Sequence, residues 1–470
     1  MDQYSRTPLF LPNFIVVKEA TQQFIHGVPS YVIHGKLIEP NYRYCPFCHG
    51  HRMQRNGTRN IRLRHVSIGK SIIYVEVSYK RWECQDCHKT FRHRIPFREK
   101  GHNITKVFAK EIEHFLSIGE TPTQCSKQLH YNRTTIQHLD KKRIRTLAKD
   151  MKPRHPSRFI CVDEFLLHKG HEYATIVIDY ETGESLFATQ GNTYGQMIEF
   201  FRFVGRKFMK NVQAVSMDMN ASYAKAFREY YPHITIVYDG FHMVKNYNDM
   251  VLTEVRRAEQ RRIDDEIEKA LSEGNKALVK ELREEKKFFK NSRYLILSNR
   301  KTLELKDASA SEYNDALFER YEKRGLKLPI GKHYLSAHNI RRLDEVLSAN
   351  EKLQTCYTLG EMLKSSLWCR DENQFFNGFN QWISMAKKTG YEELERYSSL
   401  IRRHWQGILA RITYPISNGP LEGTNCLVKN IRRQSYGIRD DEYFFLRIWE
   451  ATRKHPKHRT VDFSPHHFSA

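Results

Sequence analysis

The sequence predicts an α/β protein built around a mixed sheet, with two small domains before the sheet and a long helical region after it. Three observations support this prediction. Short runs rich in Ile and Val lead into acidic residues between Arg158 and Gly240, two Cys-x-x-Cys pairs precede that stretch, and apolar residues recur at helical spacing from about residue 246 to residue 410. Short apolar runs are typical of buried strands, whereas a period of about 3.6 residues is typical of helices.

The central stretch, predicted to fold in the order β-β-β-α-β-α-β, places acids at the ends of strands. Three predicted strands lead into an aspartate: Phe159–Val162 into Asp163, Val212–Val215 into Asp218, and Ile234–Val237 into Asp239. An aspartate after a single strand is usually a turn residue. Three of them in one sheet favour acids that converge at one edge and hold metal ions for two-metal chemistry on a phosphodiester.

The charge balance indicates a polyanionic partner. Of 470 residues, 77 are Lys or Arg and 54 are Asp or Glu, which gives a net charge of +23. Nucleic acid is the obvious partner, and the clustering of basic residues in 52–64, 80–100 and 141–158 weakens the alternative that the charge only confers solubility. No apolar run approaches membrane-spanning length and no secretion signal is evident. We therefore expect a cytoplasmic, nucleoid-associated protein without a membrane or small-molecule partner.

The two Cys-x-x-Cys pairs predict a zinc-ribbon domain over residues 41–100. The four residues are Cys45, Cys48, Cys84 and Cys87, with 35 residues between the pairs. Two such pairs supply the four thiolates that a tetrahedral Zn²⁺ site requires, and the intervening segment alternates like a strand. Redox chemistry is the alternative for any single pair. Residues 1–40 show two weak strand-like patches and are predicted to be an N-terminal arm.

Residues 101–152 predict three short helices. Thr123 can cap the second helix and Asn132 the third. The arrangement resembles a helix-turn-helix, in which the first residues of the third helix reach base edges in the major groove. These candidate DNA-binding residues are Arg133, Thr134, Thr135, Gln137 and His138. A purely structural bundle is the alternative, and the basic run 141–143 could contact phosphates or form a solvated helix face.

A second candidate for chemistry follows the helical region. Asn418 or Gly419 can cap a helix with Pro420 at its first position, which places Glu422 in the first turn. The residues that follow Glu422 on the same helix face are Asn425, Lys429 and Arg432. Such a face could hold a metal ion and a phosphate together. A capping glutamate above an ordinary basic helix would give the same pattern.

Taken together, these segments resemble the DDE-type transposases of bacterial insertion sequences, in the branch named ISL-three. The resemblance covers about residues 42–450 and includes the paired Cys-x-x-Cys knuckles. Its other motifs are CVDEFLLHKGHEYATIVID, VSMDMNASYAKAF, YYPHITIVYDGFHMVKN and SNGPLEGTNCLVKNIRRQSYGIRD, and the last three are specific when they occur in this order. One small departure is Tyr231-Pro232, where the family often has Phe-Pro.

The resemblance implies a ribonuclease H-like core interrupted by an all-helical insertion, and DNA strand cleavage and joining without a covalent enzyme intermediate. It implies a catalytic triad of Asp163, Asp218 and Glu422, in which Asp163 would bridge two Mg²⁺ (or Mn²⁺) ions while the other two acids each bind one. The residues expected to support this site are Asp239, His242 and Asn425. Asp239 and His242 match the family's Asp-x-Phe-His stretch, and contact with DNA is the alternative role for these two residues. The partners expected are the element's terminal inverted repeats and target DNA, with a homodimer holding both ends.

We therefore expect seven segments: an N-terminal arm (1–40), a zinc ribbon (41–100), a helix-turn-helix domain (101–152), the first part of the core (153–245), a helical insertion (246–410), the final helices of the core (411–455) and a tail (456–470). Two alternatives remain. One is a transposase-derived DNA-binding regulator without catalysis, which would usually have lost part of the triad. The other is a ribonuclease H-like nuclease that cuts DNA without joining ends.

Overall fold

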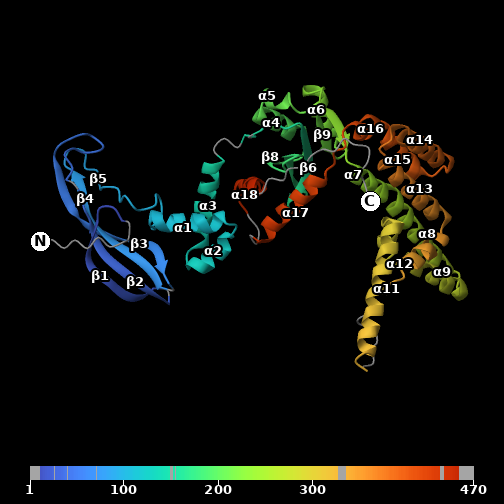
Figure 1. Ribbon diagram of the computed structural model, residues 1–470, viewed down its shortest axis with the longest axis horizontal. Helices are drawn as coiled ribbons and strands as arrows, with labels where there is room; N and C mark the ends of the chain where they lie inside the picture. The colour runs from blue at the N-terminus through green and yellow to red at the C-terminus, as the bar shows by residue number, and fades with distance from the viewer. Residues whose placement is uncertain are drawn as a thin grey trace. The chain divides into compact units, whose positions relative to one another are not determined.

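The computed structural model describes residues 11–25, 27–39, 41–69, 71–148, 152–153, 155–325, 335–434 and 439–454. The chain forms two compact units, each with its own sheet (Figure 1). Unit 1 is drawn from residues 1–151 and 427–450, and unit 2 from residues 152–426 and 451–470. The boundary falls inside α17 (Gly419–Gln434), which begins in unit 2 and ends in unit 1.

Unit 1 contains a five-stranded sheet. Its strands are β1 (Phe14–Ile25), β2 (Val28–Leu37), β3 (Met53–Ile68), β4 (Ser71–Cys84) and β5 (Thr90–Phe91). The order is β1-β2-β4-β3, and β5 pairs with β4. The two strand-like patches of residues 1–40 are therefore β1 and β2, and β2 pairs in parallel with β4. Leu37 of β2 joins Leu63, Val75 and Val77 in one apolar core.

Three helices follow this sheet: α1 (Lys106–Ser117), α2 (Pro122–Leu129) and α3 (Arg133–Leu147). Asn132 caps α3 as predicted, because its side chain accepts a hydrogen bond from the Thr135 backbone N–H. The predicted cap of α2 was wrong. Thr121, not Thr123, caps it, in a reciprocal pair of hydrogen bonds with Gln124 that lets Pro122 take the first helical position.

Arg64 joins the sheet of unit 1 to its helices. The side chain extends from β3 and is 1% exposed, with its guanidinium carbon 4.6 Å from the ring centre of Phe108 in α1. Its Nη2 donates to the carbonyl oxygen of Leu129 at the end of α2. Burial lowers the pKa of this guanidinium. The strands and the three helices therefore share one interior.

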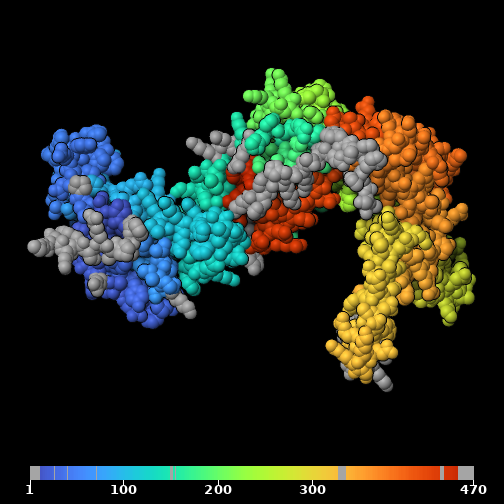
Figure 2. All heavy atoms as spheres, in the orientation of Figure 1, coloured from blue at the N-terminus to red at the C-terminus, as the bar shows by residue number. Residues whose placement is uncertain are grey.

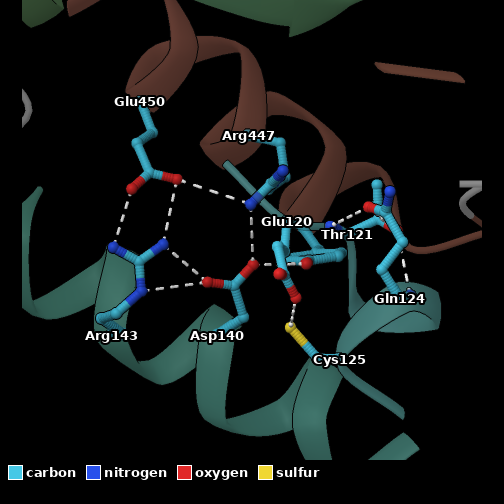
Figure 3. A network of polar contacts seen from close by, with 9 residues as sticks. Glu120, Thr121, Gln124, Cys125, Asp140, Arg143, Arg447 and Glu450 are labelled. Atoms are coloured by element: carbon cyan, nitrogen blue, oxygen red, sulfur yellow. Dashed lines mark hydrogen bonds and ion pairs between the residues drawn. The ribbon is translucent and has the colours of Figure 1, made fainter. Parts of the chain in front are cut away.

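The C-terminal helix α18 (Asp441–Lys454) packs against α3 within unit 1. Ile144 and Ala148 of α3 form an apolar cluster with Tyr443, Leu446 and Trp449. Beside this cluster lies a buried polar network (Figure 3). Asp140 is fully buried and accepts hydrogen bonds from Tyr443, Arg143 and Arg447 at 2.6–3.1 Å. The Glu450 carboxylate accepts hydrogen bonds from both Nη atoms of Arg143, at 2.7 and 3.0 Å.

All three cations of the basic run 141–143 on α3 are engaged in ion pairs. Lys141 forms ion pairs with Asp440 and Glu442, Lys142 pairs with Glu99, and Arg143 pairs with Asp140 and Glu450. These three cations therefore help to hold unit 1 together. The sequence had suggested only that they contact phosphates or form a solvated helix face.

Unit 2 is built on the predicted mixed sheet. Its strands are β6 (Phe159–His168), β7 (Glu172–Asp179), β8 (Ser185–Gln190), β9 (Ala214–Met217) and β10 (Thr235–Tyr238), in the order β10-β9-β6-β7-β8. Strands β6, β7 and β8 are antiparallel, whereas β9 and β10 run parallel to β6. The helices between them are α4 (Tyr194–Val204), the short α5 (Arg206–Met209) and α6 (Ala221–Tyr230). The predicted order of strands and helices is confirmed.

The chain then becomes helical, as its spacing predicted. The elements are α7 (Gly240–Tyr247), the π-helical turn η1 (Asn248–Thr253), α8 (Glu254–Ser272), α9 (Lys276–Phe289), α10 (Arg293–Leu297), α11 (Arg300–Glu322), α12 (Asn339–Ser348), α13 (Glu351–Leu367), α14 (Glu372–Lys388), α15 (Glu392–Arg403) and α16 (Trp405–Thr413). Figure 2 shows α11, in yellow, extending away from the other helices of this region. No helix among the described residues is long and apolar enough to cross a membrane.

Buried aromatic residues hold the helical region to the end of the sheet. Tyr247 of α7 donates from its hydroxyl to the Cys356 carbonyl of α13 at 2.6 Å. Tyr397 of α15 donates to the Met243 carbonyl of α7 at 2.9 Å. A Cβ at Gly360 would lie 2.8 Å from the Tyr247 ring, so α13 approaches α7 as closely as a glycine allows. Helix α7, which follows β10 directly, is thereby fixed in position.

Candidate active site

The three aspartates of the sheet lie in one row at its edge. Val162 of β6 pairs with Met217 of β9, and Met217 pairs with Tyr238 of β10. Asp163, Asp218 and Asp239 each follow one of these three aligned residues. Because the three strands are parallel and in register, their next residues emerge side by side. The structure thus brings together the three acids that the sequence placed after apolar runs.

One detail of that prediction was wrong. Strand β6 does not end at Asp163 but continues to His168, with Asp163 paired to Ile176 of β7. Only the parallel pairing with β9 stops there. Asp163 is therefore held between regular backbone on both sides, and it is 8% exposed.

Two hydrogen bonds orient the Asp163 carboxylate. Its Oδ1 accepts from the backbone N–H of Glu164 at 2.8 Å, and its Oδ2 accepts from Nδ2 of Asn425 at 2.9 Å. Burial raises the pKa of Asp163, and the negative charge of Asp239 adds to this rise, while these hydrogen bonds and His242 oppose it. The site therefore keeps a carboxylate in a place where its charge is costly.

Asp218 is half-buried and experiences the same environment. Burial and the charges of Asp163 and Glu164 raise its pKa to about 6, while His242 opposes the rise. Among the described residues, neither Asp163 nor Asp218 forms an ion pair with a lysine or arginine. Two neighbouring carboxylates of this kind would be stabilised in their charged forms by a cation between them.

Asp239 and His242 shape the neighbouring helix. Asp239 is buried and caps α7, accepting from the His242 backbone N–H at 3.4 Å. Its other oxygen accepts from the backbone N–H of Asn418 at 3.3 Å. Both carboxylate oxygens are thus engaged by backbone, whereas the half-buried His242 side chain lies close enough to Asp163 and Asp218 for its charge to lower their pKa values.

The segment before α17 is anchored on this same edge. Cys161 Sγ donates to the Ser417 carbonyl oxygen at 3.6 Å, and Ser216 Oγ donates to Asn418 Oδ1 at 2.8 Å. Ile416 packs against Phe159, Ala214 and Val237. Asn418 is 1% exposed, and its Nδ2 has no hydrogen-bond partner within the described parts of the chain. These contacts fix where α17 starts, and sequence analysis did not identify Cys161 or Ser216 as part of them.

Helix α17 places Glu422 and Asn425 one turn apart. Asn425 contacts Asp163 directly, and Glu422 is exposed, with no side-chain hydrogen bond to either Asp163 or Asp218 among the described residues. Lys429 and Arg432 lie in the half of α17 that belongs to unit 1. There Lys429 is exposed, and the Arg432 guanidinium lies 5.1 Å from the ring centre of Phe444.

One acid near the row was not selected from the sequence. Glu164 follows Asp163 directly, and its carboxylate accepts a hydrogen bond from Asn192 Nδ2 at 2.6 Å. The charge of Glu164 also raises the pKa of Asp218. Successive side chains of a strand point to opposite faces of the sheet, so the residue after a site acid would not be expected to share the site. The only signal in the sequence for Glu164 was its position beside Asp163.

The predicted DNA-binding residues begin α3. Arg133, Thr134 and His138 are exposed there, Gln137 is half-buried, and the Thr135 backbone N–H bonds to the Asn132 side chain at 3.0 Å. The residues at the start of this helix are thus presented on its outer face, next to the buried stripe of Ile136 and Leu139.

The four predicted cysteine ligands converge in unit 1. Their sulfur atoms all lie within 4.8 Å of one another, with Cys45 and Cys87 at 3.7 Å and Cys48 and Cys84 at 3.5 Å. Four thiolates bound tetrahedrally at about 2.3 Å from one metal ion would lie roughly 3.8 Å apart, so the cluster could hold a metal ion.

Comparison with known proteins identifies the family. The model of the ISL3 group of DDE transposases, described as a transposase, matches residues 160–448, more than half of the chain. The chain is 27% identical over 406 residues to the transposase for insertion sequence element IS1001 of Bordetella parapertussis, which covers 86% of this chain and 87% of that protein. It is 23% identical over 293 residues to the transposase for IS1557 of Mycobacterium tuberculosis, over 61% of this chain and 58% of that protein. This chain therefore belongs to the ISL3 family of insertion-sequence transposases.

Proposed function

We propose that this transposase binds the terminal inverted repeats of its insertion sequence and catalyses metal-dependent cleavage and transfer of DNA strands. The observation that carries the proposal is the row of Asp163 and Asp218 at one sheet edge, to which Asn425 ties the helix that bears Glu422. The mixed sheet, followed by a helical region and then by α17, supports a ribonuclease H-like core with a helical insertion.

The residues of this edge fit divalent metal ions. Carboxylate oxygens are the ligands that Mg²⁺ and Mn²⁺ prefer. The pKa values of Asp163 and Asp218 are raised although His242 lies nearby, and neither acid pairs with a lysine or arginine among the described residues, so a cation would stabilise their charged forms. Asp163, Asp218 and Glu422 would hold the ions. When bound, such ions activate a water or 3′-hydroxyl nucleophile and stabilise the leaving oxygen.

The chain's own groups prepare the site for a phosphodiester. Asn425 and the Glu164 N–H fix both oxygens of Asp163. Asp239 holds α7 and the start of α17 in place through backbone hydrogen bonds. His242 contributes a titratable group beside the two aspartates. Glu422 remains exposed on the first turn of α17, where its carboxylate is available for a ligand.

Unit 1 supplies DNA recognition in this proposal. The exposed Arg133, Thr134 and His138 at the start of α3 would reach base edges, as in a helix-turn-helix, with Thr135 and Gln137 beside them. Lys429 and Arg432 would contact the phosphate backbone of the DNA. The four cysteines would bind a structural Zn²⁺. A homodimer would hold two transposon ends in one complex.

The two rival functions predict different products. A silent regulator would bind the inverted repeats without cutting, and a nuclease would cut without joining. The purified full-length protein is therefore incubated with labelled duplexes that carry the element's ends, a target plasmid and Mg²⁺. Wild type is expected to yield cleaved ends and strand-transfer products, and Asp163→Asn and Glu422→Gln to bind the duplex without either product. Glu172→Gln, an exposed acid on β7, is the matched control and should behave as wild type.

Each failure would be informative. Cleavage that persists in Asp163→Asn would remove that residue from the catalytic set. Cleavage without joining in wild type would favour the nuclease, and binding without cleavage would favour the regulator.

A further inference from the structure

A second cluster of charge lies in unit 1, on the segment between β5 and α1. Here a cavity of about 490 Å³ is lined by four basic residues, Arg92, Arg94, Arg98 and Lys100, together with Glu99. We call the four basic residues the basic pocket. Residues 80–100 are rich in cations, but the sequence alone predicts no particular site there.

The positive charge of the basic pocket has no acidic partner in the part of the chain that the structure describes. The only acid that lines this cavity is Glu99, and its carboxylate is paired with Lys142 at 2.6 Å. None of the four cations forms an ion pair among the residues that the structure describes. Arg98 instead donates to neutral oxygens, from Nε to the His102 carbonyl at 2.9 Å and from Nη2 to Asn103 Oδ1 at 2.8 Å.

The arginines of the basic pocket are held in place. The hydrogen bonds of Arg98 fix two of its nitrogen atoms, and the Arg92 guanidinium carbon lies 4.6 Å from the ring centre of Tyr79. The pKa of Arg98 is lowered by burial and by the neighbouring charge of Arg92. Two arginines held close together, neither of them paired with an acid among the described residues, form a typical anion-binding arrangement, since an anion relieves their repulsion.

The basic pocket adjoins helix α3. The ion pair of Glu99 ends on Lys142 of that helix, and the charge of His138 acts on the pKa of His102, a residue that also bonds Arg98. His138 is one of the exposed residues at the start of α3. A duplex whose major groove received the start of α3 would present its backbone phosphates to residues flanking that helix.

We propose that Arg92, Arg94, Arg98 and Lys100 form a site for backbone phosphates of duplex DNA beside helix α3. The inference rests on the proposed DNA-binding function and adds the contact that positions the duplex without reading its sequence. Phosphate contacts of this kind contribute affinity equally to all sequences and make it depend on salt.

The test measures the affinity of the full-length protein for two duplexes of equal length, one with the element's inverted repeat and one unrelated, over a range of salt concentrations. We expect Arg98→Gln and Arg94→Gln each to weaken binding to both duplexes by a similar factor, roughly fivefold, and to reduce the salt slope by about one. Arg62→Gln is the control, because Arg62 is exposed in the same unit but already paired with Glu76.

Three results would overturn the proposal. The first is an unchanged affinity and slope in both variants. The second is a loss confined to the inverted repeat, which would assign these arginines to base recognition. The third is an equal loss in Arg62→Gln, which would indicate a diffuse charge effect. Arg94 is exposed, so its variant tests the site even if Arg98→Gln fails to fold. If wild type binds neither duplex, the proposed function fails as well, whereas normal binding by both variants removes the basic pocket alone.

Discussion

Asn425 on α17 donates a hydrogen bond to Asp163 on β6 at 2.9 Å, across a separation of 262 residues. The bond brings the end of the helical region back to the sheet edge from which that region departs. It uses one oxygen of the carboxylate, and the Glu164 N–H uses the other. The orientation of Asp163 thus depends on a residue that is not itself an acid.

The first prediction follows from that bond. Asn425→Ala should leave the Asp163 carboxylate with only the Glu164 N–H to orient it, so the protein would need more Mg²⁺ for half-maximal cleavage and would cleave about 10–100-fold more slowly at low Mg²⁺. The measurement is the cleavage rate as a function of Mg²⁺ concentration. Asn430→Ala, an exposed asparagine on the same helix, is the control. An equal loss at every Mg²⁺ concentration would argue against an orienting role.

The second prediction concerns pH. The raised pKa of Asp218, about 6, means that the folded protein keeps a proton that the unfolded chain releases near pH 4. Between these values the folded state binds more protons, so stability falls as pH rises through the window and stays lower above it. In Mg²⁺-free buffer, Asp218→Asn should therefore raise the free energy of unfolding by ~1–3 kcal/mol at pH 8 and by much less at pH 5. The measurement is the thermal midpoint of both proteins at the two pH values.

Mg²⁺ supplies the second arm of this experiment. Added at pH 8, it should stabilise wild type more than Asp218→Asn, because only the carboxylate gains from a bound cation. Glu172→Gln should not change the midpoint at either pH, since that side chain is exposed. A gain in Asp218→Asn that is equal at pH 5 and pH 8 would mean that the substitution acts through packing and not through charge.

The third prediction concerns the four cysteines. Purified protein should contain about one Zn²⁺ per chain by elemental analysis, and Cys84→Ser should lose it together with the fold of the cysteine knuckles. Cys426→Ser, an exposed cysteine outside the cluster, should keep the metal. Protein without zinc that retains its thermal midpoint would contradict a structural role for the cluster.

How much the sequence could predict depended on the range of the interaction. Strands β6, β9 and β10 and the aspartates that follow their apolar runs could be predicted from local sequence rich in Ile and Val, and the cap of α3 from Asn132. The strand-like patches of residues 1–40 were visible, but their pairing with β4 was not, because a parallel pairing between β2 and β4 leaves no local mark in the sequence.

The same limit applied to the site. Glu422 and Asn425 were selected for their shared helix face, whereas Cys161 and Ser216 were not, because each acts only through a partner some 200 residues or more away. The charges of α3 show the limit most clearly. Arg143 in a basic run is indistinguishable from a solvated cation until α18 supplies Glu450.

The last prediction tests that arrangement. Asp140 is fully buried between Arg143 and Arg447, so Asp140→Asn would leave these two guanidinium groups with Glu450 as their only acidic partner among the described residues. Removing one partner of a buried ion network costs ~3–5 kcal/mol because the remaining charge stays desolvated. Asp140→Asn should therefore lower the free energy of unfolding of unit 1 far more than Glu442→Gln, which removes an exposed partner of Arg145 and Lys141 on the same helix pair. If chemical denaturation shows equal losses, Asp140 is not what holds α18 on α3. A double variant with Arg143→Met should recover part of the loss, since it removes one of the two charges that Asp140→Asn exposes.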